Sequence, residues 1–145
     1  MKVAIASDHS GMTIRNEIIS LMKEMKLEYI NLSCECSTSI DYPDYAALVA
    51  EKIANGDADR GILIRGTGIR LSMAANKVKG IRSALVHDTF SKVTRRHNDI
   101  NTEEERVISP GLACEIIKMW LTTPFEGGRH KHTVNRITAY EAIFE

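Results

Sequence analysis

Two hydrophobic patterns alternate along the chain. Short and nearly all-apolar runs, which are typical of buried strands, occur at 2–7 (KVAIAS), 27–33 (LEYINLS), 61–64 (GILI), 81–86 (IRSALV) and 106–109 (RVIS). Apolar residues at helical spacing lie between the first two runs, at Ile14, Ile18, Leu21, Met22 and Met25. Tyr42-Pro43-Asp44 is typical of a helix start, because proline is favoured in the first turn. The pattern therefore predicts alternating strands and helices.

This alternation predicts an α/β fold. Strands that are apolar throughout indicate a parallel sheet with helices on both faces, since right-handed crossovers place the helices there. We therefore expect a three-layer, Rossmann-like sandwich with a five-stranded parallel sheet. No linker, low-complexity segment or solenoid repeat interrupts residues 1–145, which are expected to form a single domain.

Composition narrows the class of protein. Nineteen basic and nineteen acidic residues give no net charge, so nothing favours binding to nucleic acid or to an anionic membrane. The apolar run at the N-terminus is too short for a signal peptide or a spanning helix, which predicts a cytoplasmic protein. Cys34, Cys36 and Cys114 form no CxxC pair, and no cluster of histidines or carboxylates accompanies them, so we expect free thiols and no metal.

The predicted topology indicates where a ligand would bind. A doubly wound sheet binds its ligand beyond the carboxyl ends of its strands. Polar or glycine-rich groups follow four of the predicted strands: Ser7-Asp8-His9, the loop 36–42, Arg65 to Gly68, and His87-Asp88. Each group alone is ordinary loop chemistry. Their convergence on one edge of the sheet predicts a site there.

Five motifs, spaced over nearly the whole chain, resemble the ribose-5-phosphate isomerase B family, which also contains the galactose-6-phosphate isomerase subunits. They are SDHSG at 7–11, DYPDYA at 41–46, GTGI at 66–69 with AANK at 74–77, HND at 97–99 and FEGGRH at 125–130. The resemblance implies a metal-independent aldose–ketose isomerase of phosphorylated sugars that needs no cofactor. It also implies a homodimer or homotetramer whose active sites are shared between subunits.

Aldose–ketose isomerisation needs a base, donors for the enediolate oxygens, a group that opens the sugar ring and a cationic clamp for the phosphate. Thr67 and the backbone N–H groups of 66–70, Gly66 and Gly68 included, suit the enediolate role at a helix N-terminus. The resemblance implies the other roles: ring opening by His97 with Asn98 beside it, a phosphate clamp of His9 and Arg129, and sugar contacts from Asp8 and Tyr42.

Several positions depart from the family pattern. Arg65 stands where many members have a cysteine base, and a guanidinium has no lone pair with which to accept a proton. Leu71 occupies the position at which other members carry a carboxylate, and Arg70 replaces a glycine. Thr133 replaces a second arginine of the clamp. The connection NTEEERVIS is also shorter and more acidic than the family's.

These departures leave three hypotheses. The first is an isomerase with an altered substrate, in which Arg65 and Arg70 meet a second anionic group and Asp8 or another residue transfers the proton. The second is a weak or inactive sugar-phosphate-binding subunit of a heteromeric isomerase. The third is a nucleotide-binding module, which the absence of GxGxxG after the first strand disfavours.

Overall fold

The computed structural model describes residues 1–33, 41–106 and 108–144. In chain order its elements are β1 (Lys2–Ser7), the 3₁₀ helix η1 (His9–Gly11), α1 (Met12–Glu24), β2 (Glu28–Asn31), α2 (Tyr42–Ala54), β3 (Arg60–Arg65), α3 (Ile69–Ala75), β4 (Ser83–Val86), α4 (Ser91–Asn98), β5 (Thr102–Arg106), α5 (Pro110–Thr122) and α6 (Arg129–Ile143).

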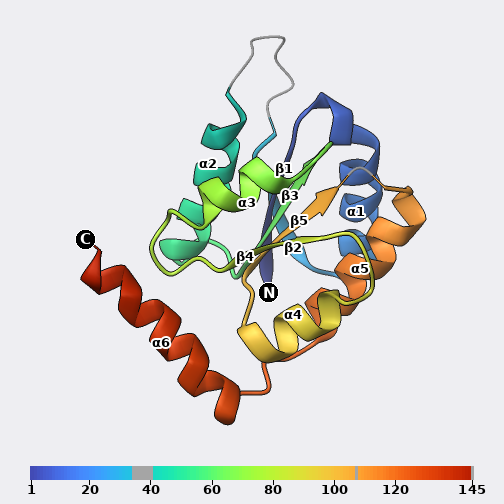
Figure 1. Ribbon diagram of the computed structural model, residues 1–145. Coiled ribbons are helices and arrows are strands. Elements are labelled where there is room, and N and C mark those ends of the chain that lie inside the picture. Colours follow the sequence, from blue (N-terminus) through green and yellow to red (C-terminus); the bar gives the residue numbers. More distant parts are fainter. Residues whose placement is uncertain (34–40, 107, 145) are drawn as a thin grey trace.

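Within these described ranges the strands form one sheet in the order β2-β1-β3-β5-β4, and every neighbouring pair is parallel. Helices α1 and α5 cover one face, and α2 and α3 cover the other (Figure 1). Successive strand residues point to opposite faces. Val3 and Ile5 accordingly pack with α1 and α5, whereas Ala4 and Ala6 pack with α2 and α3. The nearly all-apolar run at 2–7 thus reflects burial on both faces, and the predicted Rossmann-like α/β architecture is confirmed.

The prediction of a strand at 106–109 is wrong. The strand is Thr102–Arg106, and it lies between β3 and β4, with Thr102 beside Gly61 and Arg106 beside Arg65. Residues 103–105 are all glutamate, a composition that hydrophobic patterning does not assign to the middle of a parallel sheet. Its backbone pairs with β3 on one side and with β4 on the other, and this pairing, which composition does not reveal, makes the segment a strand.

The structure also adjusts the ends of other elements. The predicted strands at 27–33 and 81–86 are shorter than expected, at Glu28–Asn31 and Ser83–Val86. The helix predicted to open at Tyr42 begins there, and Pro43 lies in its first turn. Ser109 caps α5 by accepting a hydrogen bond from the backbone N–H of Leu112 at 3.3 Å. The start of α2 was therefore predicted correctly, whereas Ser109 belonged to the strand predicted at 106–109 and its capping role was missed.

Helix α6 projects from the body of the molecule (Figure 1). Gly127 and Gly128, both with positive φ, lead into it, and Glu141 near its end accepts hydrogen bonds from the backbone N–H of Gly80 at 3.1 Å. Apart from the buried Val134, its large apolar side chains are uncovered: Ile137 is 48% exposed and Ile143 is 64% exposed. The helix therefore lacks the packing that normally stabilises an amphipathic helix.

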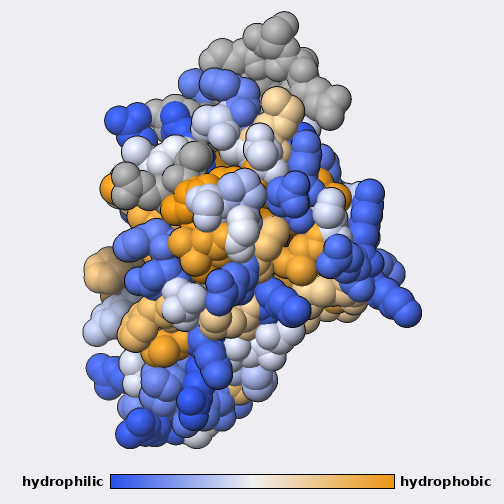
Figure 2. Space-filling model, turned by 90° about the vertical axis from the view of Figure 1, so that its right-hand side faces the viewer, coloured by the Kyte–Doolittle hydropathy of each residue, from blue (hydrophilic) through white to orange (hydrophobic). Residues whose placement is uncertain are grey.

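The face on the α1 and α5 side also has hydrophobic side chains across its middle, with hydrophilic ones around them (Figure 2). Surface apolar groups are common in globular proteins, so their presence alone assigns no role to this face. None of the helices in the described part of the chain is long and apolar enough to cross a membrane.

Candidate functional site

Asp8 lies at the carboxyl end of β1 and uses both carboxylate oxygens. Its Oδ1 accepts hydrogen bonds from the backbone N–H groups of Ser10 and Gly11, at 3.0 and 3.2 Å, and from the Ser10 hydroxyl at 2.5 Å. Its Oδ2 lies 3.2 Å from Arg65 Nε. Asp8 therefore caps η1 and pairs with the arginine at the end of β3. These contacts occupy both oxygens of the carboxylate that the sequence analysis offered for proton transfer.

Arg65, which stands where the resemblance implies a cysteine base, forms an ion pair with Asp8. Its side chain is 25% exposed, that of Asp8 is 22% exposed, and the pair bridges two neighbouring strands at their carboxyl ends. A ligand that bound Arg65 through Nε would displace Asp8. Arg70, the second residue of α3, is exposed.

The turn between β3 and α3 has the predicted form. Gly68 has a φ of 70°, a left-handed conformation that glycine adopts readily, and it is the N-cap of α3. A Cβ added at Gly66 would meet nothing within 4 Å, so the turn faces open space. Thr67 is exposed beside it. A small anionic group can therefore approach the backbone here.

A small cavity lies below this turn, lined by Ala6, Ser7, Asp8, Tyr45, Leu63, Ile64, Arg65 and Leu71. Leu71 is 3% exposed and contributes to the core beneath α3. Leu71, at the position where the resemblance implies a carboxylate in other members, is thus part of the hydrophobic core. Tyr42 begins α2, but its side chain, like Cys34 and Cys36, lies outside the described residues.

Two other sequence candidates have structural surroundings of their own. His9 is exposed in η1 at the same edge of the sheet. In the His87-Asp88 group, Asp88 accepts a hydrogen bond from the backbone N–H of Phe90 at 2.8 Å. Asp88 therefore has the ordinary turn role that its residue type allows.

His97 lies at the end of α4, away from the turn at Gly66. Its ring stacks on the ring of His130, with centroids 4.2 Å apart and planes inclined by 10°. Glu126 lies beside both rings: its carboxylate oxygens are 3.9 Å from Nε2 of His97 and 3.9 Å from Nε2 of His130. His97 is therefore half-buried in a cluster built from α4, α6 and the segment that joins α5 to α6, rather than an isolated histidine at a helix end.

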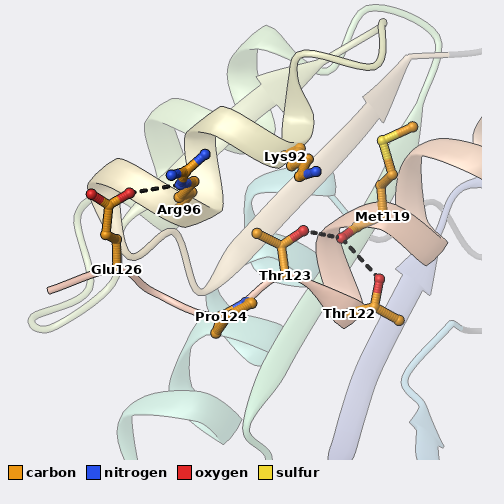
Figure 3. Close-up of a pocket in the computed structure, with 7 residues that line it drawn as sticks. All are labelled: Lys92, Arg96, Met119, Thr122, Thr123, Pro124 and Glu126. Carbon is orange, nitrogen blue, oxygen red and sulfur yellow. Dashed lines mark hydrogen bonds and ion pairs between the residues drawn. The ribbon is translucent and has the colours of Figure 1, made fainter.

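Glu126 is held by Arg96, whose Nε lies 2.6 Å from its Oε2. The hydrogen bond from Arg96 lowers the pKa of Glu126 below its usual value, and the charges of Arg96, His130 and His97 act in the same direction. Arg96 and Glu126 also line a shallow pocket between α4 and the end of α5 (Figure 3). Lys92 lies on the same side of this pocket as Arg96, while Met119 and Pro124 supply apolar surface.

Within the described residues, His97, Glu126 and His130 bring possible metal-ligand atoms within 4.8 Å of one another. Two features oppose a cation there. Arg96 pairs with Glu126, and Arg129 Nε donates to His130 Nε2 at 3.4 Å. The charges of this cluster favour an anion over a metal ion.

The candidate residues thus fall into two groups, one at the carboxyl ends of the parallel strands and one at their amino ends. Asp8, His9, Arg65 and the turn at 66–68 follow the carboxyl ends of β1 and β3. The second group, which contains His97, Asn98 and Arg129, is close to the amino end of β5 (Figure 1). The six residues of β3 span about 17–20 Å at ~3.3 Å each. The site predicted beyond the carboxyl ends of the strands thus contains the first group, and the clamp of His9 and Arg129, which the resemblance implies in a site shared between subunits, does not form within one chain.

No motif or spacing in the sequence connects His97 with Glu126 and His130. Both residues lie in the FEGGRH motif, but the motif alone does not show which part of the chain it contacts. Their spacing from His97 is not helical, so only the packing of α6 beside α4 brings the three together. Thr133, in place of the second clamp arginine, is exposed on α6.

Comparisons with known proteins agree with this fold and these motifs. The family model described as Ribose/Galactose Isomerase matches residues 3–137, so the chain belongs to this family of sugar isomerases. The chain is 63% identical over 145 residues to a Bacillus subtilis protein, YwlF, named as a sugar phosphate isomerase, and 97% of each chain is covered. It is 41% identical to ribose-5-phosphate isomerase B of Escherichia coli over 143 residues, which cover 97% of this chain and 96% of that one.

Solved structures show the same likeness. Ribose-5-phosphate isomerase B of Clostridium thermocellum superposes with a TM-score of 0.93 at 40% identity, and all of both chains is covered. The Mycoplasma genitalium enzyme, determined with bound ribulose-5-phosphate, gives a TM-score of 0.90 at 38% identity, covering 97% of this chain and 96% of that one.

Proposed function

We propose that this chain is an aldose–ketose isomerase of a phosphorylated sugar, of the ribose 5-phosphate/ribulose 5-phosphate type. The observation that carries the proposal is the likeness, over nearly the whole chain, to an isomerase whose structure contains bound ribulose-5-phosphate. The open glycine turn at 66–68 and the half-buried His97 support it, since they supply two of the chemical parts that the reaction requires.

Each part has a proposed role. The N–H groups of the turn and the Thr67 hydroxyl stabilise the enediolate oxygens as they become negative. His97, with Asn98 beside it, opens the sugar ring by proton transfer. His9 and Arg129 bind the phosphate, for which a guanidinium has suitable geometry.

The complete site needs two copies of the chain. The two groups of residues are separated by the length of a strand, and a pentose phosphate is shorter than that. One copy of the chain therefore cannot contact a single substrate with both groups. We propose a homodimer, or a homotetramer built from such dimers, in which one copy supplies Asp8, His9 and the turn and another supplies His97, Asn98 and Arg129. Two uncovered apolar surfaces support this assembly: Ile69 and Met73 beside the turn, and the projecting helix α6.

The substrate is proposed to carry a second negative group. Arg65 and Arg70 both lie at the turn, where a carboxylate or second phosphate could meet them. Because Arg65 already pairs with Asp8, the ligand's acid group would replace the Asp8 carboxylate as partner of Arg65. Ribose 5-phosphate has no such group and is therefore expected to be a poor substrate.

The test is proton exchange in deuterated water. The purified chain is incubated with pentose and hexose phosphates, with and without a carboxylate or second phosphate, and deuterium at C1 or C2 is followed by NMR. We expect exchange that is fastest on a doubly anionic sugar, and Arg65→Ala should remove that preference. Absence of exchange on every sugar would reject the isomerase, whereas brisk turnover of ribose 5-phosphate, undiminished in Arg65→Ala, would reject the altered substrate alone.

A further inference from the structure

The turn that ends α4 is closed by an arginine from the segment before β4. Arg82 Nε donates to the backbone carbonyl oxygens of Asn98 and Asp99, at 3.2 and 3.1 Å. The last carbonyl groups of a helix have no partner within the helix, and positive charge is favourable beside them. Arg82 therefore satisfies two carbonyls next to His97.

The side chain of Asp99 is shared by two arginines. Its Oδ2 lies 2.9 Å from Arg82 Nη2, and its Oδ1 forms an ion pair with Arg95 Nη1. Arg95 Nη1 also donates to the carbonyl oxygen of Ile100 at 3.4 Å. The two arginine side chains are only 18% and 11% exposed. Removal of the carboxylate would thus leave two largely buried cations without their common partner, an arrangement that is strongly unfavourable.

Burial lowers the pKa of Arg95 from its usual value, and the charge of Asp99 opposes that effect. The backbone at Asp99 is left-handed, with a φ of 50°. The ion pairs of Asp99 with Arg82 and Arg95 therefore hold a backbone conformation that few residues other than glycine, asparagine and aspartate adopt readily.

The same turn is anchored to the sheet through Asn101. Its Oδ1 accepts the backbone N–H of Arg82 at 2.9 Å, and its Nδ2 donates to the carbonyl oxygen of Gly80 at 2.9 Å. The segment 98–101 is consequently fixed to the residues that precede β4. Its position does not depend on α4 alone.

His97 has few contacts of its own to fix it. In the part of the chain that the structure describes, its ring stacks on His130 and approaches Glu126 at 3.9 Å, but it has no hydrogen bond. The location of the ring therefore depends on the backbone immediately after it. We propose that Asp99 is a positioning residue for ring opening: through Arg82 and Arg95 it fixes the end of α4 so that His97 meets the sugar.

This inference rests on the proposed role of His97 and assigns a role to the third residue of the HND motif. The test is Asp99→Asn, which keeps the size of the side chain and its tolerance of left-handed backbone but removes the shared charge. The control is Asp57→Asn, which removes a carboxylate that is paired with Lys52 at 3.1 Å and is 53% exposed.

The kinetic readout compares ring and open-chain sugar phosphates, well below the melting temperature of each variant. We expect Asp99→Asn to reduce kcat/KM on the ring form by about 10- to 100-fold, the loss typical of a catalytic group displaced by about 1 Å. Exchange on the open-chain form should remain near that of the unaltered chain, and Asp57→Asn should change neither. An equal loss on both forms, or no loss on the ring form, would overturn the proposal.

The second readout does not depend on turnover. NMR of the histidine ring protons reports the stack of His97 on His130, and Asp99→Asn should shift both resonances while Asp57→Asn leaves them in place. If Asp99→Asn lowers the melting temperature but leaves these resonances unchanged, Asp99 only stabilises the fold and the positioning role is rejected. If the unaltered chain exchanges no sugar proton, the proposed function fails, and the ring shifts still decide whether Asp99 positions His97.

Discussion

At the scale of single residues, two side chains that depart from the family pattern have defined contacts in the fold. Arg65 forms an ion pair with Asp8, and Leu71 belongs to the core beneath α3. The arginine at the position where the family resemblance implies a base thus forms a contact between β1 and β3. Its effect on catalysis and its effect on stability are therefore coupled, and variants of Arg65 need both measurements.

The phosphate clamp gives a prediction at this scale. Arg129→Ala should weaken binding of a phosphorylated sugar by about 2 to 5 kcal/mol, because it removes one side of a hydrogen-bonded charge pair. The exposed neighbour Lys131 provides the control, since Lys131→Ala removes the same charge from the same helix. Isothermal titration calorimetry of both variants would measure the difference. Equal weakening by the two substitutions would assign the effect to general electrostatics instead.

The acid titration of Glu126 gives a second prediction. Arg96 lowers the pKa of this carboxylate, so the contribution of the pair to stability is present above the usual glutamate pKa and is lost as the pH falls through the lowered value. Arg96→Gln should raise the midpoint measured by carbon NMR at the Glu126 carboxyl. Lys92 lines the same pocket, and Figure 3 shows no ion pair between it and Glu126, so Lys92→Gln should leave the midpoint nearly unchanged. A midpoint that is the same in all three proteins would contradict the assigned cause.

At the scale of elements, the approach of η1 to β3 leaves no space for a side chain at Gly11. An added Cβ would lie 2.6 Å from Ile64 Cγ2 and 3.0 Å from the Ile64 carbonyl oxygen. At Gly111, in the first turn of α5, an added Cβ would meet nothing within 4 Å. The two glycines therefore differ in packing and form a matched pair.

We expect Gly11→Ala to lower the free energy of unfolding by about 1 to 3 kcal/mol through overpacking. Gly111→Ala should be neutral or should raise it by up to about 1 kcal/mol, because alanine is the better helix former. Urea denaturation of the two variants measures both effects. If Gly11→Ala left the free energy of unfolding unchanged, β3 and η1 could move apart without loss of stability, and overpacking would be contradicted.

At the scale of the whole molecule, α6 leaves apolar surface uncovered that a second copy could cover. Ile137 and Tyr140, one helical turn apart, are 48% and 51% exposed. Substitution of both by glutamate should convert an assembly of copies into monomers and abolish isomerase activity, because the two groups of site residues would no longer meet.

Light scattering at micromolar concentration, together with the exchange assay, would measure both effects. Asn135→Glu is the control, since this exposed residue lies on the opposite side of α6 from Ile137. A stable monomer that is still active would overturn both the assembly and the shared site.

The sequence by itself determined the alternation of strands and helices, the glycine turn at 66–68 and the helix start at Tyr42, because these depend on neighbouring residues and on burial of both faces of the sheet. It misplaced β5, since hydrophobic patterning does not predict a strand with three consecutive glutamates, although its backbone pairs with β3 and β4. Only the tertiary structure decided that Asp8 pairs with Arg65 and that His97 stacks on His130. It also decided that these two pairs lie at opposite ends of the parallel strands. Such contacts join residues far apart in the chain, and no periodicity or local motif encodes which distant side chains the packing of helices and strands brings together.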